Sequence, residues 1–168
     1  MALRPNHPDT LSAASVLFFN LGQQAEAFQL GRQAARLDPL NPATQIDLSL
    51  MFFFSENWAE GEQAARRALQ LSSAGHGYHA VLAWSLIVQK RFAEAEAELA
   101  FEHSEIERLN GLGLLALGRG QTAVAREHLA SLENLAGRDP DRADLQQSIA
   151  WLCAGLGEVD RAFAALEK

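Results

Sequence analysis

Large apolar residues recur three and four positions apart along most of the chain, which is the spacing of one face of an α-helix. Leu48 and Phe52 show this spacing, as do Leu82 and Leu86. Glycine and proline interrupt the pattern often enough to keep each helix short. The sequence therefore predicts five pairs of helices, with first helices near 9–21, 43–56, 77–90, 105–118 and 142–155 and second helices near 24–37, 59–72, 92–103, 121–136 and 158–168.

The pattern repeats every 34 residues in the first part of the chain. Ala25, Ala59 and Ala93 each precede a glutamate at this spacing (59 − 25 and 93 − 59), and Pro8 and Pro42 are also 34 apart. Two further copies follow at altered spacing, which places short insertions and deletions in the turns between copies. We predict one solenoid domain over residues 1–168, with units at about 8–41, 42–75, 76–104, 105–138 and 139–168.

Each copy has a small residue in its second helix and another twelve positions earlier, in its first helix. The pairs are Ser15 with Ala27, Ser49 with Gly61, Ala83 with Ala95, Gly113 with Ala125, and Ala150 with Ala162. Two helices approach closely only where neither carries a bulky side chain. We therefore expect each unit to be an antiparallel hairpin whose remaining apolar face is buried by stacking on its neighbours.

Turn and capping signals support these boundaries. Pro39 and Pro42 end one hairpin and begin the next, since neither can continue a helix. Gly22 and Gly157 fall at the turns within their pairs. Ser104 with Glu107 has the spacing of a capping box, which predicts a helix start at the fourth unit.

The small-residue spacing, the 34-residue period and the junction Leu-Asp-Pro-Leu-Asn-Pro at 37–42 resemble the tetratricopeptide repeat over essentially the whole chain. Gln45 and His79 depart from the family, which often has an aromatic residue there. The resemblance implies an all-α, right-handed superhelical solenoid whose first helices line the concave side. The stretches 105–113 and 157–163 also look like the carboxy-terminal repeat regions of bacterial regulators with a winged-helix or cyclase-like domain.

Composition narrows the classes of partner and location. The net charge of −7, from 21 acidic and 14 basic residues, repels nucleic acid phosphates. The single cysteine, Cys153, precludes an internal disulfide and indicates a reducing compartment. Because no apolar run reaches the roughly 18 residues of a membrane span and the start lacks a secretory signal, we expect a cytoplasmic protein without membrane insertion.

The candidate binding surface is a strip of apolar and aromatic residues on the first helices. Its members follow the small residue of each first helix by one position, or by one further turn. They are Val16, Phe19, Leu50, Phe53, Phe54, Trp84, Ile87, Val88, Leu114, Leu117 and Trp151. Such a strip fits an amphipathic helix or an apolar peptide, although aromatic residues at helical spacing also serve as core. Acidic residues beside it, at Asp9, Asp47, Glu107 and Asp144, favour a ligand with basic flanks or, equally, belong to solvated helix starts.

Other chemistry is not supported by the sequence. Related repeats grip a chaperone carboxylate with lysine, arginine and asparagine on their first helices, and the matching positions here are Asp9, Ala13, Asp47, Gly77 and Val81. His76 and His79 lack a third metal ligand. We expect no enzyme activity, no cofactor and no metal, since the chain has no phosphate loop, nucleophile elbow or catalytic set.

Two functions use the same strip. We expect a protein-interaction adaptor that binds a peptide or amphipathic helix, as part of a larger bacterial regulator. The alternative is a bacterial secretion chaperone that shields an apolar segment of an exported protein. The last helix, ending at Leu166-Glu167-Lys168, lacks an obvious polar cap and indicates either self-association or a longer chain.

Overall fold

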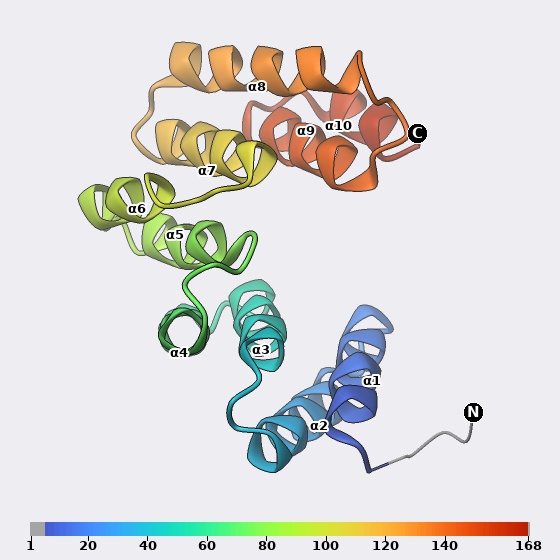
Figure 1. Cartoon of the computed structure of the whole chain (residues 1–168). Coiled ribbons are helices and arrows are strands. Elements are labelled where there is room, and N and C mark those ends of the chain that lie inside the picture. Colours follow the sequence, from blue (N-terminus) through green and yellow to red (C-terminus); the bar gives the residue numbers. More distant parts are fainter. Residues whose placement is uncertain (1–5, 168) are drawn as a thin grey trace. The chain divides into compact units, whose positions relative to one another are not determined.

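A computed structural model describes residues 6–167, and every regular element in this range is an α-helix (Figure 1). The helices are α1 (Pro8–Asn20), α2 (Gln24–Leu37), α3 (Pro42–Phe54), α4 (Trp58–Leu71), α5 (Tyr78–Val88), α6 (Phe92–Leu99), α7 (Glu105–Gly118), α8 (Thr122–Ala136), α9 (Ala143–Gly155) and α10 (Val159–Leu166). The all-α class and the ten helices predicted from the sequence are therefore confirmed.

The largest difference from the predicted boundaries is at the end of α6. We expected this helix to continue to about residue 103, but it ends at Leu99 and a turn follows. The Glu102 carboxylate folds back and accepts a hydrogen bond from the Ser104 N–H at 2.9 Å. This contact holds the short connection that replaces the last turn of α6.

The capping box predicted at α7 is half right. The Ser104 hydroxyl oxygen accepts a hydrogen bond from the Glu107 N–H at 3.4 Å, as the motif requires. The reciprocal bond, from the Ser104 N–H to the Glu107 carboxylate, is replaced by the bond to Glu102. The prediction was wrong on this point because Glu102 is two residues from Ser104 and reaches the same donor first.

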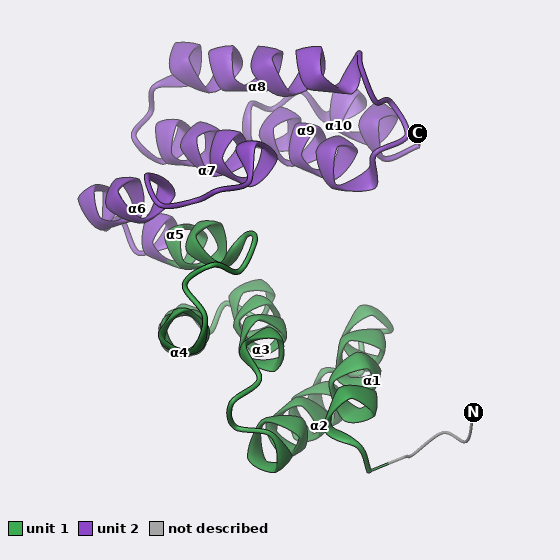
Figure 2. Cartoon of the chain, in the orientation of Figure 1, with its two compact units in different colours: residues 1–85 green, residues 86–168 purple. Residues whose placement is uncertain are grey.

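The chain divides into two compact units, residues 1–85 and residues 86–168, and the division falls inside α5 (Figure 2). In the first unit, α1 pairs with α2 and α3 with α4, and both α1 and α2 contact α3. In the second unit, α7 pairs with α8 and α9 with α10, while α7 and α8 contact α9 and α6 contacts α7. Each unit thus uses the same rule: helices pair as hairpins, and each second helix packs on the next first helix.

Close helix contacts occur at the predicted small residues. The Ser49 hydroxyl donates a hydrogen bond of 2.7 Å to the Gly61 carbonyl, which joins α3 to α4 inside one hairpin. A Cβ atom at Gly61 would lie 3.2 Å from the Ser49 carbonyl oxygen. A Cβ atom at Gly113 of α7 would lie 2.6 Å from Leu152 Cδ1 of α9, so this glycine also brings neighbouring hairpins together.

The turn inside every hairpin contains one residue with left-handed backbone geometry. Three are glycines, Gly22, Gly120 and Gly157, with φ between 73° and 78°. At the same repeat position the second and third hairpins have Glu56 and Lys90, both with φ of 61°. A side chain is rarely accommodated there, because Cβ crowds the carbonyl oxygen. The sequence analysis identified two of these turns from their glycines.

Candidate partner-binding face

In the first unit the predicted strip centres on an aromatic cluster. The Phe53 ring lies 5.4 Å from the Phe54 ring in an edge-to-face arrangement and 6.3 Å from the Trp84 ring. Phe54 is 49% exposed and Phe53 is half-buried, whereas only 6% of Trp84 is exposed. Phe54 and Phe53 therefore offer ring surface to a partner, whereas Trp84 is buried beside Phe53.

The rest of the strip in this unit is shared with the core. Phe19 packs against a buried cluster that includes Ala27 and Met51, and its ring lies 6.3 Å from the Phe28 ring. Val16 and Leu50 are half-buried. These side chains expose only part of their surface, so the aromatic cluster is the largest apolar feature among the predicted binding residues here.

In the second unit the strip consists of half-buried aliphatic residues and one tryptophan. Leu114 and Leu117 pack against the buried cluster formed by α7, α8, α9 and α10. Trp151 and Ile87 are half-buried, and Val88 is 36% exposed. The eleven predicted residues thus fall into two separate sets, one in each unit, and their role in binding stays a prediction.

Asp47 lies among polar side chains from both neighbouring first helices of the first unit. The Ser12 hydroxyl of α1 donates a hydrogen bond of 2.8 Å to Asp47 Oδ2 on α3. Burial raises the pKa of the Asp47 carboxyl, and the Ser12 bond partly offsets this effect. The pKa of Tyr78, on α5, is raised by burial and then by the negative charge of Asp47. Asp47 is therefore an incompletely compensated acidic group.

A second acidic group occupies the start of α7. Glu107 has a raised pKa, caused first by burial and then by the carboxylates of Glu102 and Asp144. Asp144 itself is paired with Arg142 at 2.8 Å, and that hydrogen bond lowers its pKa. A cationic group placed beside Glu107 would relieve the repulsion among these carboxylates.

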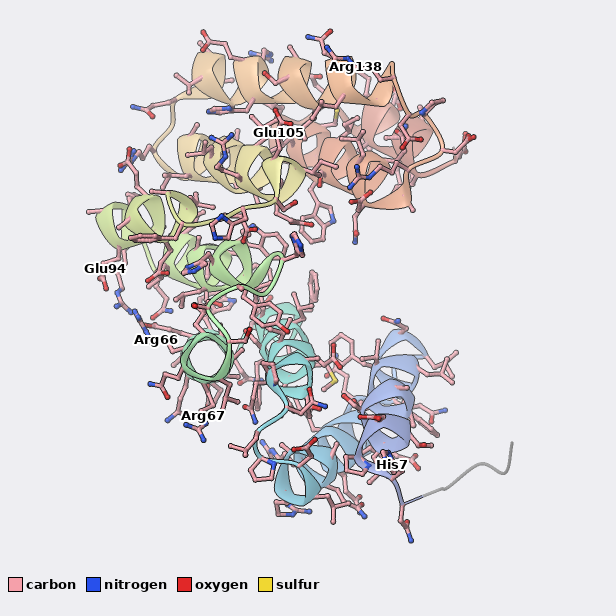
Figure 3. All side chains as sticks on the ribbon, viewed as in Figure 1. His7, Arg66, Arg67, Glu94, Glu105 and Arg138 are labelled. Carbon is pink, nitrogen blue, oxygen red and sulfur yellow. The ribbon has the colours of Figure 1, made fainter. Side chains whose placement is uncertain are left out.

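The first helices carry few basic side chains. The first helices α1, α3, α5, α7 and α9 carry one guanidinium, that of Arg108, against the carboxylates of Asp9, Asp47, Glu105, Glu107 and Asp144. The second helices carry six arginines together with nine carboxylates, and Figure 3 shows Arg66 and Arg67 projecting from α4. In each unit, the first helices that carry the strip residues are therefore net acidic.

The contacts that surround Asp47 were not predicted from the sequence, although the repeat period contains a signal for them. Ser12 and Asp47 are 35 residues apart, one repeat period plus one. Asn110 donates to the Ser148 carbonyl at 3.3 Å across 38 residues, which is the local period of 37 plus one. Residues separated by a period plus one thus meet across adjacent first helices, and this register could have been read from the repeat alone.

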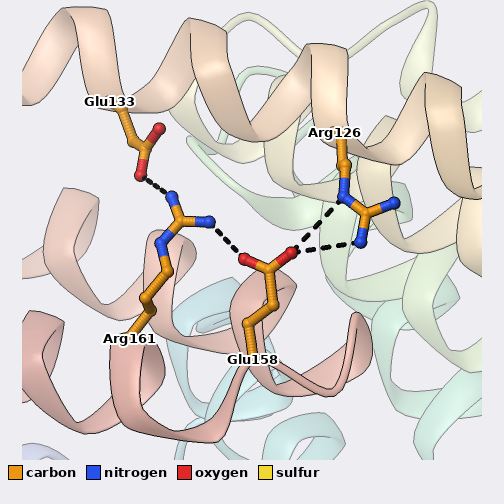
Figure 4. Close-up of polar contacts among 4 residues, drawn as sticks. All are labelled: Arg126, Glu133, Glu158 and Arg161. Atoms are coloured by element: carbon orange, nitrogen blue, oxygen red, sulfur yellow. Dashed lines mark hydrogen bonds and ion pairs between the residues drawn. The ribbon is translucent and has the colours of Figure 1, made fainter.

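Concave pockets lie away from the strip. One, of about 440 Å³, is lined by α8, α9 and α10 and includes Cys153, whose pKa is raised by burial, and Arg161. Arg161 also bridges Glu133 of α8 and Glu158, which in turn bonds Arg126 at 3.2 Å (Figure 4). Another pocket lies between α3 and α4 and includes Phe52 and Arg67. Neither pocket contains a predicted binding residue.

Residues 6–167 also bear on metal binding and on membrane insertion. No group of three or more histidine, cysteine, aspartate or glutamate side chains there is arranged to hold a metal ion. Within the same range, each helix is too short or too polar to cross a membrane.

No protein-family model and no curated protein matches the chain. Solved structures do. The structure described under "Functional Characterization of Pseudomonas Aeruginosa pilF" aligns with a TM-score of 0.66 and 20% identity, over 94% of this chain and 72% of that one. PilW, described as a widely conserved type IV pilus biogenesis factor, aligns with a TM-score of 0.66 and 16% identity, over 95% of this chain and 76% of that one. YrrB, described as a TPR protein with an unusual peptide-binding site, aligns with a TM-score of 0.59 and 15% identity, over 98% of this chain and 85% of that one. With its paired helices and their 34-residue register, the chain has the tetratricopeptide-repeat solenoid fold.

Proposed function

We propose that this chain is a protein-interaction scaffold that binds an apolar peptide or amphipathic helix with basic flanks on its first-helix face. The observation that carries the proposal is the Phe53–Phe54–Trp84 cluster on a face that is otherwise acidic. Rigid aromatic side chains bury a large area at small entropic cost, so they are effective anchors.

The charge on the first helices of each unit supports basic flanks. Asp47 and Glu107 are partly buried carboxylates with raised pKa values, and a lysine or arginine beside either would stabilise its ionised form. YrrB, which shares the fold, is described as having a peptide-binding site. A role within a larger regulator would use this face for assembly or for sensing.

A displayed library of helical peptides tests the proposal. Each peptide carries apolar residues at i, i+4 and i+7, and the flanks are lysine/arginine-rich in one half of the library and glutamate-rich in the other. We expect the chain to select the basic-flanked half. Phe54→Ala should lower the affinity of the chain for the selected peptides about tenfold, equivalent to ~1.4 kcal/mol of binding free energy.

Val124→Ala is the matched control, because Val124 is 38% exposed on α8, a second helix. It should leave binding unchanged. Selection that survives Phe54→Ala but is lost in the Val124→Ala variant would place the binding surface on the second helices and refute the proposal.

A further inference from the structure

Large apolar side chains are exposed on the last helix and at the end of the first helix. On α10, Phe163 is 64% exposed and Leu166 is 61% exposed. On α1, Leu17 is 57% exposed, and Leu21, the residue directly after this helix, is 63% exposed. We call the first pair the tail face and the second pair the head face.

The repeat shows what these positions do elsewhere in the chain. Leu166 is four residues after the small residue of its second helix, and the equivalent residues are all buried. They are Gly31, Ala65, Leu99 and Leu129. Leu17 is ten residues before the small residue of its hairpin, and its equivalents are buried as well. They are Met51, Ser85, Leu115 and Leu152.

These two classes of position face each other where consecutive hairpins meet. At the contact between α2 and α3, a Cβ atom at Gly31 would lie 3.1 Å from Met51 Cε. At the contact between α8 and α9, Leu129 and Leu152 belong to one buried cluster. A leucine pair therefore fits this junction, so Leu166 and Leu17 are complementary in size and in register.

A ring pair repeats the match. Phe28 of α2 stacks on Phe52 of α3 with ring centroids 4.9 Å apart and an interplanar angle of 29°. By repeat position, Phe163 is the equivalent of Phe28, and Phe18 of α1 is the equivalent of Phe52. A tail face laid on a head face in the same register would form this stack again.

A third pair of equivalent positions is charged between consecutive hairpins but apolar on the tail face and the head face. Glu96 of α6 and Arg119, just after α7, form an ion pair of 2.6 Å between consecutive hairpins of the second unit. Their equivalents at the two exposed faces are Phe163 and Leu21, both apolar. At this position pair, the contact would therefore hold two apolar side chains instead of an ion pair.

Of the two charged residues of α10, Arg161 lies on another side of the helix, whereas Asp160 lies one turn before Phe163 on the same side. Arg161 points toward Glu133 of α8 (Figure 4). Phe163 is two residues further on, roughly 200° around the helix, so it projects from the opposite side. The tail face is therefore separate from the ion pairs that bind α10 to α8.

We propose that the tail face of one copy docks on the head face of a second copy, in the register of the α2–α3 contact. The contact continues the packing that already joins consecutive hairpins inside each unit. It is heterologous, because each copy offers one tail and one head, and association beyond two copies follows. This proposal is independent of what the first-helix face binds.

Sedimentation velocity over a concentration series tests it. We expect the parent chain to rise above the 18.3 kDa of a monomer as concentration increases. Leu17→Gln and Phe163→Gln should each remain at the monomer mass, because each removes one of the two faces while keeping a residue that favours helix. An equimolar mixture of the two variants should regain association but stop at twice the monomer mass.

Leu40→Gln is the matched control, since Leu40 is 70% exposed in the loop between α2 and α3 and belongs to neither face. It should associate as the parent does, and circular dichroism of all variants checks that the helices are retained. A parent chain that stays monomeric, as when another protein or further repeats cover these faces, overturns the proposal. So does loss of association in the Phe163→Gln variant alone, which would indicate a symmetric tail-to-tail dimer.

Discussion

Replacing Gly113 with alanine tests whether small residues set the spacing of neighbouring hairpins. The added methyl group would lie 2.6 Å and 2.8 Å from the two Cδ atoms of Leu152, which is fully buried. Leu152 cannot move freely, because it packs within the cluster formed by α7, α8, α9 and α10. The substitution therefore forces either a poor rotamer at Leu152 or a displacement of α9.

Two terms of opposite sign determine the size of the effect. Alanine is favoured over glycine inside a helix by about 1 kcal/mol. Overpacking of a well-filled core costs about 1–3 kcal/mol. We expect Gly113→Ala to destabilise the chain by up to about 2 kcal/mol, measured as a lower urea midpoint with an unchanged slope.

A double-mutant cycle separates the two terms. Leu152→Ala removes both clashing atoms and costs about 2–5 kcal/mol by itself. In that background, Gly113→Ala should stabilise the chain by about 1 kcal/mol, which gives a coupling energy of about 1–3 kcal/mol. As a control, Gly113→Ala with Leu48→Ala, a buried leucine of the other unit, should be additive to within about 0.5 kcal/mol. Additivity with Leu152→Ala would refute the spacing role of Gly113.

Three further substitutions give separate tests. Glu56→Gly and Lys90→Gly each relieve left-handed backbone strain of about 1–2 kcal/mol, but they add about 0.4–1 kcal/mol of conformational entropy to the unfolded chain. Each should therefore stabilise the chain by roughly 0.5 kcal/mol in urea unfolding, while Gly157→Ala should destabilise it. A loss of stability in both glycine variants would contradict this. Glu107 has a folded pKa raised above its unfolded value of about 4.3, so stability is lost as pH rises from that value through the folded pKa. Glu107→Gln should therefore raise the melting temperature at pH 7 and not at pH 4, and equal gains at both values would contradict the burial argument. Asn41→Ala removes the side chain that accepts hydrogen bonds from two first-turn amides of α3, and it should lower the free energy of unfolding in urea by about 1 kcal/mol. An unchanged urea midpoint would mean that water replaces the cap.

The sequence predicts the fold well because the same pattern of small and large apolar residues recurs in every hairpin. Where a serine or glycine faces another small residue, as Ser49 does Gly61, close approach follows directly, and the structure shows the contact. The proline at the start of α3 likewise fixes where this helix begins, because proline lacks the backbone N–H that a helix interior needs. The end of α6 was less predictable, because a single carboxylate, that of Glu102, decides it.

The binding face is harder to predict because spacing along a helix does not say how deeply a side chain is packed. Trp84 and Phe54 occupy strip positions with similar apolar character, yet one is almost fully buried and the other is half exposed. The difference arises from neighbouring helices, whose approach depends on residues a full period away. Contacts one period plus one apart, as at Ser12 and Asp47, supply part of this information and were not used.

The short last helix has a consequence for local dynamics. α10 has eight residues and packs on α9, and its ion pairs to α8 involve exposed arginine side chains that contribute little in water. Its amide hydrogens should therefore exchange with deuterium sooner than those of the buried α9, because a terminal segment opens without unfolding its neighbours. If a second copy covers Phe163 and Leu166, the deuterium uptake of α10 becomes dependent on protein concentration.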